Sequence, residues 1–210
     1  MYKHKLVYES MKRCLELEGK YTHVDNDASY YIERHPDCDR ILNIFFEWSN
    51  GKTDWKHNFD FPAKPYRDMK DTWFCHRGFL KVWKSIEPHI ADAIMDPKTT
   101  MIYIVGYSHG GAIAQLCHEY VCFHRPDIYV LSVAIGSPRV YWGPIRKNVS
   151  ERFDGCYVIR NGRDLVTKLP PALFGFRDIC DVVHVGGKGV GPIKDHFPER
   201  YLEILDREGL

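Results

Sequence analysis

The feature that most constrains this chain is a short apolar run, MIYIV at 101–105, followed at once by GYSHGG at 106–111. The apolar run predicts a buried strand, and residues 111–124 predict a helix that ends before Pro126. Between them, glycines stand two residues before and two residues after Ser108. A serine in a sharp strand-to-helix turn needs such neighbours, because larger side chains would clash there. We therefore expect the Ser108 hydroxyl at the carboxyl edge of a sheet, beside the positive end of a helix.

A neutral serine hydroxyl is a weak nucleophile, so this interpretation requires a histidine base and a carboxylate that orients the histidine. In chains with such a turn, the acid and then the histidine follow the serine. Asp164 comes just after a predicted strand at 155–160, and His196 follows the Gly-rich run GGKGVGPIKD. We therefore expect Ser108 to act as nucleophile, His196 as base and Asp164 as the orienting acid.

Other residues compete for the roles of acid and base. Asp178 and Asp181 are alternative acids, and Asp195 is expected to cap the last helix. The ring of His109 is excluded as the base, because adjacent side chains at this kind of turn point apart. The other histidines that we considered are expected to pack in the core, lie on the surface or support loops, namely His76, His118, His124 and His184.

Helical and strand patterns alternate along the rest of the chain. They predict an α/β fold with a mostly parallel central sheet and helices on both faces. An antiparallel pair of strands at 28–33 and 40–46 is expected near the N-terminus, joined by a His-Pro-Asp turn. Beyond those already named, strands are expected at 128–135 and 181–185, and helices at 4–18, 79–95, 142–152 and 195–207. The sequence contains no internal repeat or linker, so we expect one domain over residues 1–210.

The segment around 47–72 is too long and too aromatic for a simple connection, and we expect it to be a lid or binding loop. It carries Trp48 and Trp55. Pockets for small molecules are mostly apolar with a few polar groups. We therefore expect Trp48 and Trp55 to contact the substrate. Tyr107, which directly precedes Ser108, is expected to do so as well.

Composition excludes several classes of protein. The 29 Lys+Arg balance 28 Asp+Glu, which argues against a nucleic-acid binder, and 44% apolar residues argue against disorder. No stretch approaches the roughly 18 apolar residues of a membrane span. The seven cysteines are scattered without a CxxC pair, so we expect neither a disulfide framework nor a metal site. Residues 1–17 lack the apolar core of a secretory signal. We expect a cytoplasmic protein, with export without a leader as the alternative.

Six segments resemble, in order, those of the class 3 lipases, the α/β-hydrolase group that contains the fungal triacylglycerol lipases. They lie at 46–49 with Trp55, 76–79, 106–111, 136–140, 157–171 and 195–196. The resemblance implies an α/β-hydrolase fold and hydrolysis of carboxylic esters of lipid or acylglycerol type through an acyl-serine, with no cofactor. It also implies an oxyanion hole formed by the backbone N–H groups of Ser49 and His109. The chain departs from the family pattern at Glu47 and Trp48, where Arg-Gly is usual.

The same three residues can serve related reactions. A phospholipase, a thioesterase and an acyltransferase therefore stay open, as does a catalytically inactive binding protein with a hydrolase fold. The expected partners are a lipid or small ester substrate and, transiently, a lipid interface.

Overall fold

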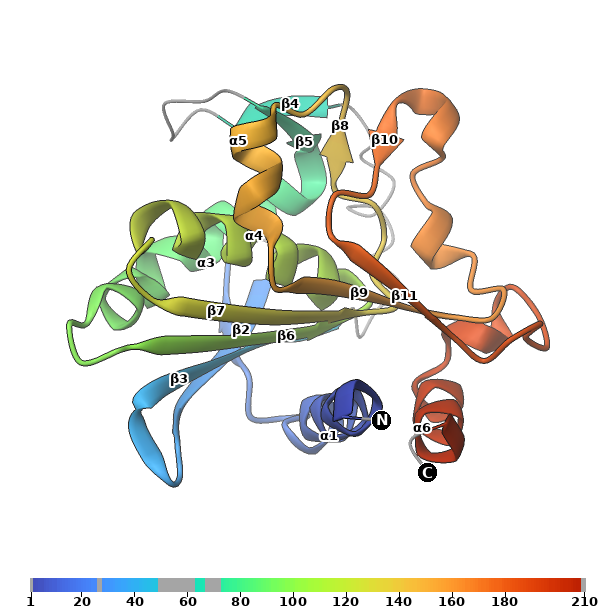
Figure 1. Cartoon of the computed structure of the whole chain (residues 1–210), viewed down its shortest axis with the longest axis horizontal. Helices are drawn as coiled ribbons and strands as arrows, with labels where there is room; N and C mark the ends of the chain where they lie inside the picture. The colour runs from blue at the N-terminus through green and yellow to red at the C-terminus, as the bar shows by residue number, and fades with distance from the viewer. Residues whose placement is uncertain (1, 26–27, 49–62, 67–72, 209–210) are drawn as a thin grey trace.

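A computed structural model of the chain describes residues 2–25, 28–48, 63–66 and 73–208. Among these residues, seven strands form a central sheet in the order β1-β2-β3-β6-β7-β9-β11 (Figure 1). From β3 onward the neighbours run parallel, whereas β1, β2 and β3 pair antiparallel. The strands are β1 (Thr22–Val24), β2 (Ala28–His35), β3 (Cys38–Phe46), β6 (Met101–Tyr107), β7 (Tyr129–Ile135), β9 (Cys156–Asn161) and β11 (Asp181–Val185). The predicted parallel sheet and its antiparallel N-terminal pair are confirmed.

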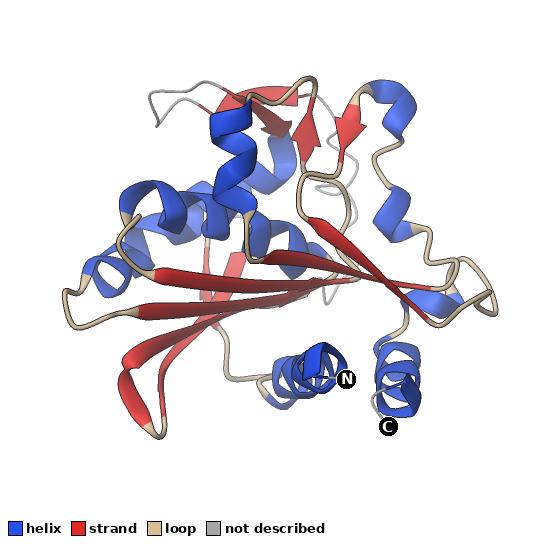
Figure 2. Ribbon diagram, viewed as in Figure 1, coloured by secondary structure: helices blue, strands red, loops and turns tan. Residues whose placement is uncertain are grey.

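Helices cover both faces of this sheet (Figure 2). The helices α1 (Tyr2–Glu16) and α6 (Pro198–Glu208) pack side by side on one face, and α3 (Arg77–Met95) and α4 (His109–His124) lie on the other. The middle strand β6 is therefore enclosed from both sides, with Ile104 and Val105 fully buried. This enclosure explains why its sequence is an unbroken apolar run instead of an alternating one.

Two expected helices differ from the observed ones. Residues 142–152 were expected to form one helix, but they contain the end of β8 (Tyr141–Trp142), then α5 (Lys147–Ser150) and the start of a 3-10 turn (Glu151–Phe153). Gly143 has φ +77°, a backbone conformation that interrupts a right-handed helix at this point. The last helix begins at Pro198, a residue favoured at a first helical position, so His196 lies before it in the short 3-10 turn Lys194–His196.

A second, four-stranded sheet was not predicted. Its order is β10-β8-β5-β4, with β4 (Ala63–Tyr66), β5 (Trp73–His76) and β10 (Phe176–Arg177) beside β8. Strands of two to four residues carry too little pattern to be recognised. In addition, β8 pairs with strands that are distant in the sequence, β5 and β10. β4 comes from the expected lid or binding loop. The rest of that loop, apart from its first two residues, lies outside the described residues.

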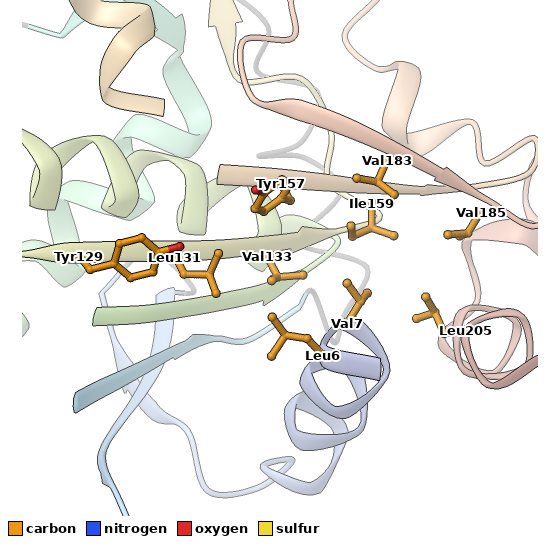
Figure 3. Close-up of a pocket in the computed structure, with 10 residues that line it drawn as sticks. All are labelled: Leu6, Val7, Tyr129, Leu131, Val133, Tyr157, Ile159, Val183, Val185 and Leu205. Carbon is orange, nitrogen blue, oxygen red and sulfur yellow. The ribbon is translucent and has the colours of Figure 1, made fainter. Parts of the chain in front are cut away.

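An apolar groove of about 220 Å³ lies on the face that α1 and α6 cover (Figure 3). Leu6 and Val7 of α1 and Leu205 of α6 form its helical walls, and Val133 and Ile159 belong to its floor. Tyr129 is at its outer end on β7.

A search of the described helices finds no segment with the length and hydropathy of a membrane span.

Candidate active site

Ser108 stands at the sharp turn between β6 and α4. Its φ of 53° makes it the one non-glycine residue in the left-handed region among those described, and its N–H donates to Ile135 O at 2.8 Å. A side chain on Gly106 would place a Cβ 2.1 Å from Gly110 O, and one on Gly110 would place it 2.3 Å from Phe46 O. Both glycines are therefore required for the turn to close, as their spacing predicts.

The structure brings Ser108, His196 and Asp164 together at the carboxyl edge of the sheet. Ser108 Oγ is 2.9 Å from His196 Nε2, and His196 Nδ1 is 2.8 Å from Asp164 Oδ2. Asp164 is buried, and the His196 side chain is mostly covered. An ionised carboxylate can only accept, so Nδ1 donates to it and Nε2 is left to take the Ser108 proton. This is the geometry of a base that is oriented from behind by an acid.

A tyrosine that holds the acid was not expected from the sequence. Tyr201 of α6 is fully buried, and its hydroxyl donates to Asp164 Oδ2 at 2.7 Å while accepting from Asn161 N at 3.1 Å. Burial raises the pKa of Tyr201 well above its ordinary value, which keeps the phenol protonated and able to donate. Asp164 Oδ1 accepts from Val166 N at 2.9 Å, so both carboxylate oxygens have partners.

Asp195 joins the loops that carry the acid and the base. Its buried carboxylate accepts from Arg163 N at 2.8 Å and from Val190 N at 2.9 Å. Burial works to raise the pKa of Asp195, but the backbone hydrogen bonds outweigh it and the pKa is lowered. Gly189 passes so close that a Cβ there would be 2.0 Å from the carboxylate. The expectation that Asp195 caps the last helix is therefore wrong, because its carboxylate is occupied by loop N–H groups.

Tyr107 lies beneath the imidazole instead of facing a substrate. It is 3% exposed, its ring stacks on His196 with centroids 5.4 Å apart, and its hydroxyl donates to His196 O. Trp48 packs against Tyr21 and Tyr107, at centroid distances of 6.2 and 6.3 Å. The structure thus argues against the expected substrate contact of Tyr107, whose ring is buried as a support for the base. Trp48 is half-buried against the edge of the core, and its expected contact with the substrate stays a prediction.

Of the two expected oxyanion residues, His109 is among the described residues and Ser49 is not. His109 begins α4, and the N–H groups of a helix's first turn point out of its end, here toward the serine. Its ring lies against Phe79, with centroids 5.5 Å apart, consistent with a backbone role. Ser49 lies outside the described residues, as does Trp55.

The competing acids and histidines have other surroundings. Asp178 forms ion pairs with Arg139 and Arg160, and Asp181 is exposed at the amino end of β11, the strand end opposite the site. Burial lowers the pKa of His118 to about 4, and its Nδ1 lies 2.7 Å from Ser132 Oγ, so it is a neutral core residue. The other three histidines considered are also away from the serine hydroxyl in their contacts: His76 caps α3, His124 packs on Tyr120, and His184 is exposed on β11.

A mostly parallel sheet with a serine at its strand-to-helix turn defines the α/β-hydrolase class. Solved structures agree: a Rhizomucor miehei lipase propeptide complex superposes with a TM-score of 0.69, at 18% identity, over 97% of this chain and 77% of that one. The family model for "Lipase (class 3)" matches residues 44–174. The chain belongs to the class 3 lipase family.

Two relatives with curated names support this membership. A "Secreted mono- and diacylglycerol lipase 1" of Fusarium solani is 29% identical over 157 residues, which cover 72% of this chain and 45% of that protein. A "Lipase" of Rhizomucor miehei is 25% identical over 67% of this chain and 40% of its own length. The matched region therefore spans less than half the length of these two relatives.

The expected cytoplasmic location is contradicted by these relatives, the first of which is named a secreted lipase. The expectation rested on the composition of residues 1–17. The composition of these residues therefore did not predict the compartment that the name of the first relative states.

Proposed function

We propose that this chain is a serine hydrolase that cleaves carboxylic esters of lipid or acylglycerol type. The hydrogen-bonded series from Ser108 Oγ through His196 to Asp164 Oδ2 carries the proposal. The names of the relatives support the substrate class. One structure of the same fold, at a TM-score of 0.63, is described as a triacylglycerol lipase whose catalytic centre is a serine protease triad.

The geometry supports a two-step acyl transfer. Ser108 Oγ attacks the ester carbonyl carbon while His196 Nε2 takes the hydroxyl proton. The tetrahedral oxyanion then accepts from the His109 N–H and from a second donor, for which Ser49 is our proposal. His196 returns the proton to the leaving alcohol, which frees the first product. Water then attacks the acyl-serine by the same route and releases the acid.

A fluorophosphonate reagent tests this proposal directly. It should attach to one serine, and peptide mapping by mass spectrometry should find the label on Ser108. Protein that is folded by circular dichroism but remains unlabelled would favour the inactive binding protein. Products from triglyceride, phospholipid and acyl-thioester panels then separate a lipase from a phospholipase or thioesterase, because the pocket, not the triad, selects the substrate.

Tyr201 is proposed as a positioning residue, and Tyr201→Phe tests it. Without the phenol hydroxyl, Asp164 Oδ2 loses one of its two donors and holds His196 less firmly. A lost hydrogen bond of about 1 to 1.5 kcal/mol predicts a kcat about tenfold lower with an unchanged KM.

The matched control is Tyr21→Phe, which removes another buried phenol that donates to Cys14 O at 3.1 Å, away from the triad. Both variants should lose some stability in urea unfolding, but only Tyr201→Phe should lose kcat. Equal kcat in the two variants would assign Tyr201 a purely structural role.

A further inference from the structure

Two neighbouring segments frame the candidate active site, at residues 163–177 and 186–197. They follow the carboxyl ends of β9 and β11 and lie toward the right of Figure 1, in orange and red. Arg163 N donates to Asp195 Oδ2 at 2.8 Å and Leu165 N to Pro192 O at 2.9 Å, so the segments touch. We call these two segments the collar. Asp164 and His196 are part of it.

The collar exposes large apolar side chains. Their exposed fractions are 90% for Leu173, 68% for Ile193, 60% for Phe174 and Val190, 49% for Phe197 and 45% for Leu165. Single exposed apolar residues are ordinary on protein surfaces, but a group of them around one site marks a surface that meets an apolar partner.

The turn at the tip of the first segment is held in place. Trp142 Nε1 donates to Phe174 O at 2.7 Å. The next residue, Gly175, has φ +88°, and a Cβ there would be 2.7 Å from the same indole nitrogen. Leu173 and Phe174 are therefore presented outward by a defined turn whose backbone is bonded to β8.

The exposed charges of the collar are all positive, although the whole chain has a net charge of only +1. The two carboxylates within the collar, Asp164 and Asp195, are 1% and 0% exposed and are occupied by the hydrogen bonds described above. Asp178, just beyond it, pairs with two arginines. The exposed cations are Arg163, Lys168, Arg177, Lys188 and Lys194.

We propose that the collar docks on an anionic lipid surface. The apolar side chains enter the boundary between headgroups and acyl chains, and the cations lie against the anionic headgroups. A neutral oil surface would interact favourably with the apolar residues only, and a soluble polyanion would pair with the cations only. Docking in this way turns the serine edge of the sheet toward the lipid. This docking rests on the proposed function, because it would bring the active site to a surface that contains lipid esters.

Vesicle flotation tests the docking without any turnover. The full chain with Ser108→Ala is mixed with vesicles of phosphatidylcholine alone or of phosphatidylcholine with phosphatidylglycerol. We expect at least about tenfold tighter binding to the anionic vesicles, since each cation near such a surface adds to the attraction. Raising NaCl from about 0.1 M to about 1 M shortens the Debye length from about 10 to about 3 Å and should abolish this preference. Equal binding to both vesicles, or a preference that salt leaves intact, overturns the proposal.

Variants locate the surface. In the Ser108→Ala background, Leu173→Ser with Phe174→Ser, and Lys188→Glu with Lys194→Glu, should each weaken binding to anionic vesicles by about tenfold or more. The matched controls are Tyr129→Ser, an aromatic as exposed as Phe174 but at the amino end of β7, and Lys98→Glu in the turn before β6. Binding that falls as much in the controls, or that survives in both collar variants, assigns docking to another surface. Ser108 labelling of the parent protein is read separately, so a failed docking experiment leaves the proposed function untouched.

Discussion

Ser108→Ala is expected to lower kcat/KM for a p-nitrophenyl ester by several orders of magnitude, on the order of 10⁴ to 10⁶. The residual rate would come from the oxyanion donors and substrate binding alone, because the members of a triad act as a unit. The loss should appear in kcat, since alanine removes only the nucleophilic oxygen.

The matched control is Ser150→Ala, which removes an exposed hydroxyl that donates to Lys147 O at 2.8 Å in α5. This variant should keep full activity. Alanine at 108 must still adopt the strained turn, so both variants should unfold at similar temperatures. A rate near that of the unchanged chain would remove Ser108 from the mechanism.

Asp164→Asn is expected to lower kcat by about 10⁴. The carboxylate accepts at both oxygens: from Val166 N at Oδ1, and from His196 Nδ1 and Tyr201 at Oδ2. An amide can accept at only one of these positions. In either orientation its NH₂ group faces a donor, and the orientation that turns NH₂ toward His196 places the proton on the wrong ring nitrogen.

The control for this variant is Asp178→Asn, which tests the acid that the sequence left open. Asp178 serves Arg139 and Arg160, so its loss should cost stability but little activity. Urea unfolding and steady-state kinetics of both variants give the comparison. If Asp178→Asn costs as much kcat as Asp164→Asn, the assignment of the acid fails.

Much of the site could be predicted because parallel strands end at one edge of a sheet. Ser108 follows β6, Asp164 follows β9 and His196 follows the loop after β11, so the predicted strand ends and a parallel sheet were enough to expect their meeting. The Gly-x-Ser-x-Gly spacing was informative because two backbone contacts leave no room for a Cβ.

The unpredicted features depend on tertiary packing. Tyr201 occupies an ordinary buried position on the inner face of α6, and only the fold shows that its hydroxyl reaches Asp164. The Tyr107 ring lies against His196 because of tertiary packing, which no local pattern encodes. Asp195 was mistaken for a cap because its true partners, Arg163 and Val190, lie on loops with no periodicity.

The carboxylate of Asp195 has a mechanical consequence. It spans two loops at 2.8 and 2.9 Å, with no space beside Gly189, so neither loop can shift by an ångström without pulling the other. The next residue in the chain is His196. A displacement of either loop is thus passed to Asp195 and from there to the imidazole of His196, which takes the serine proton.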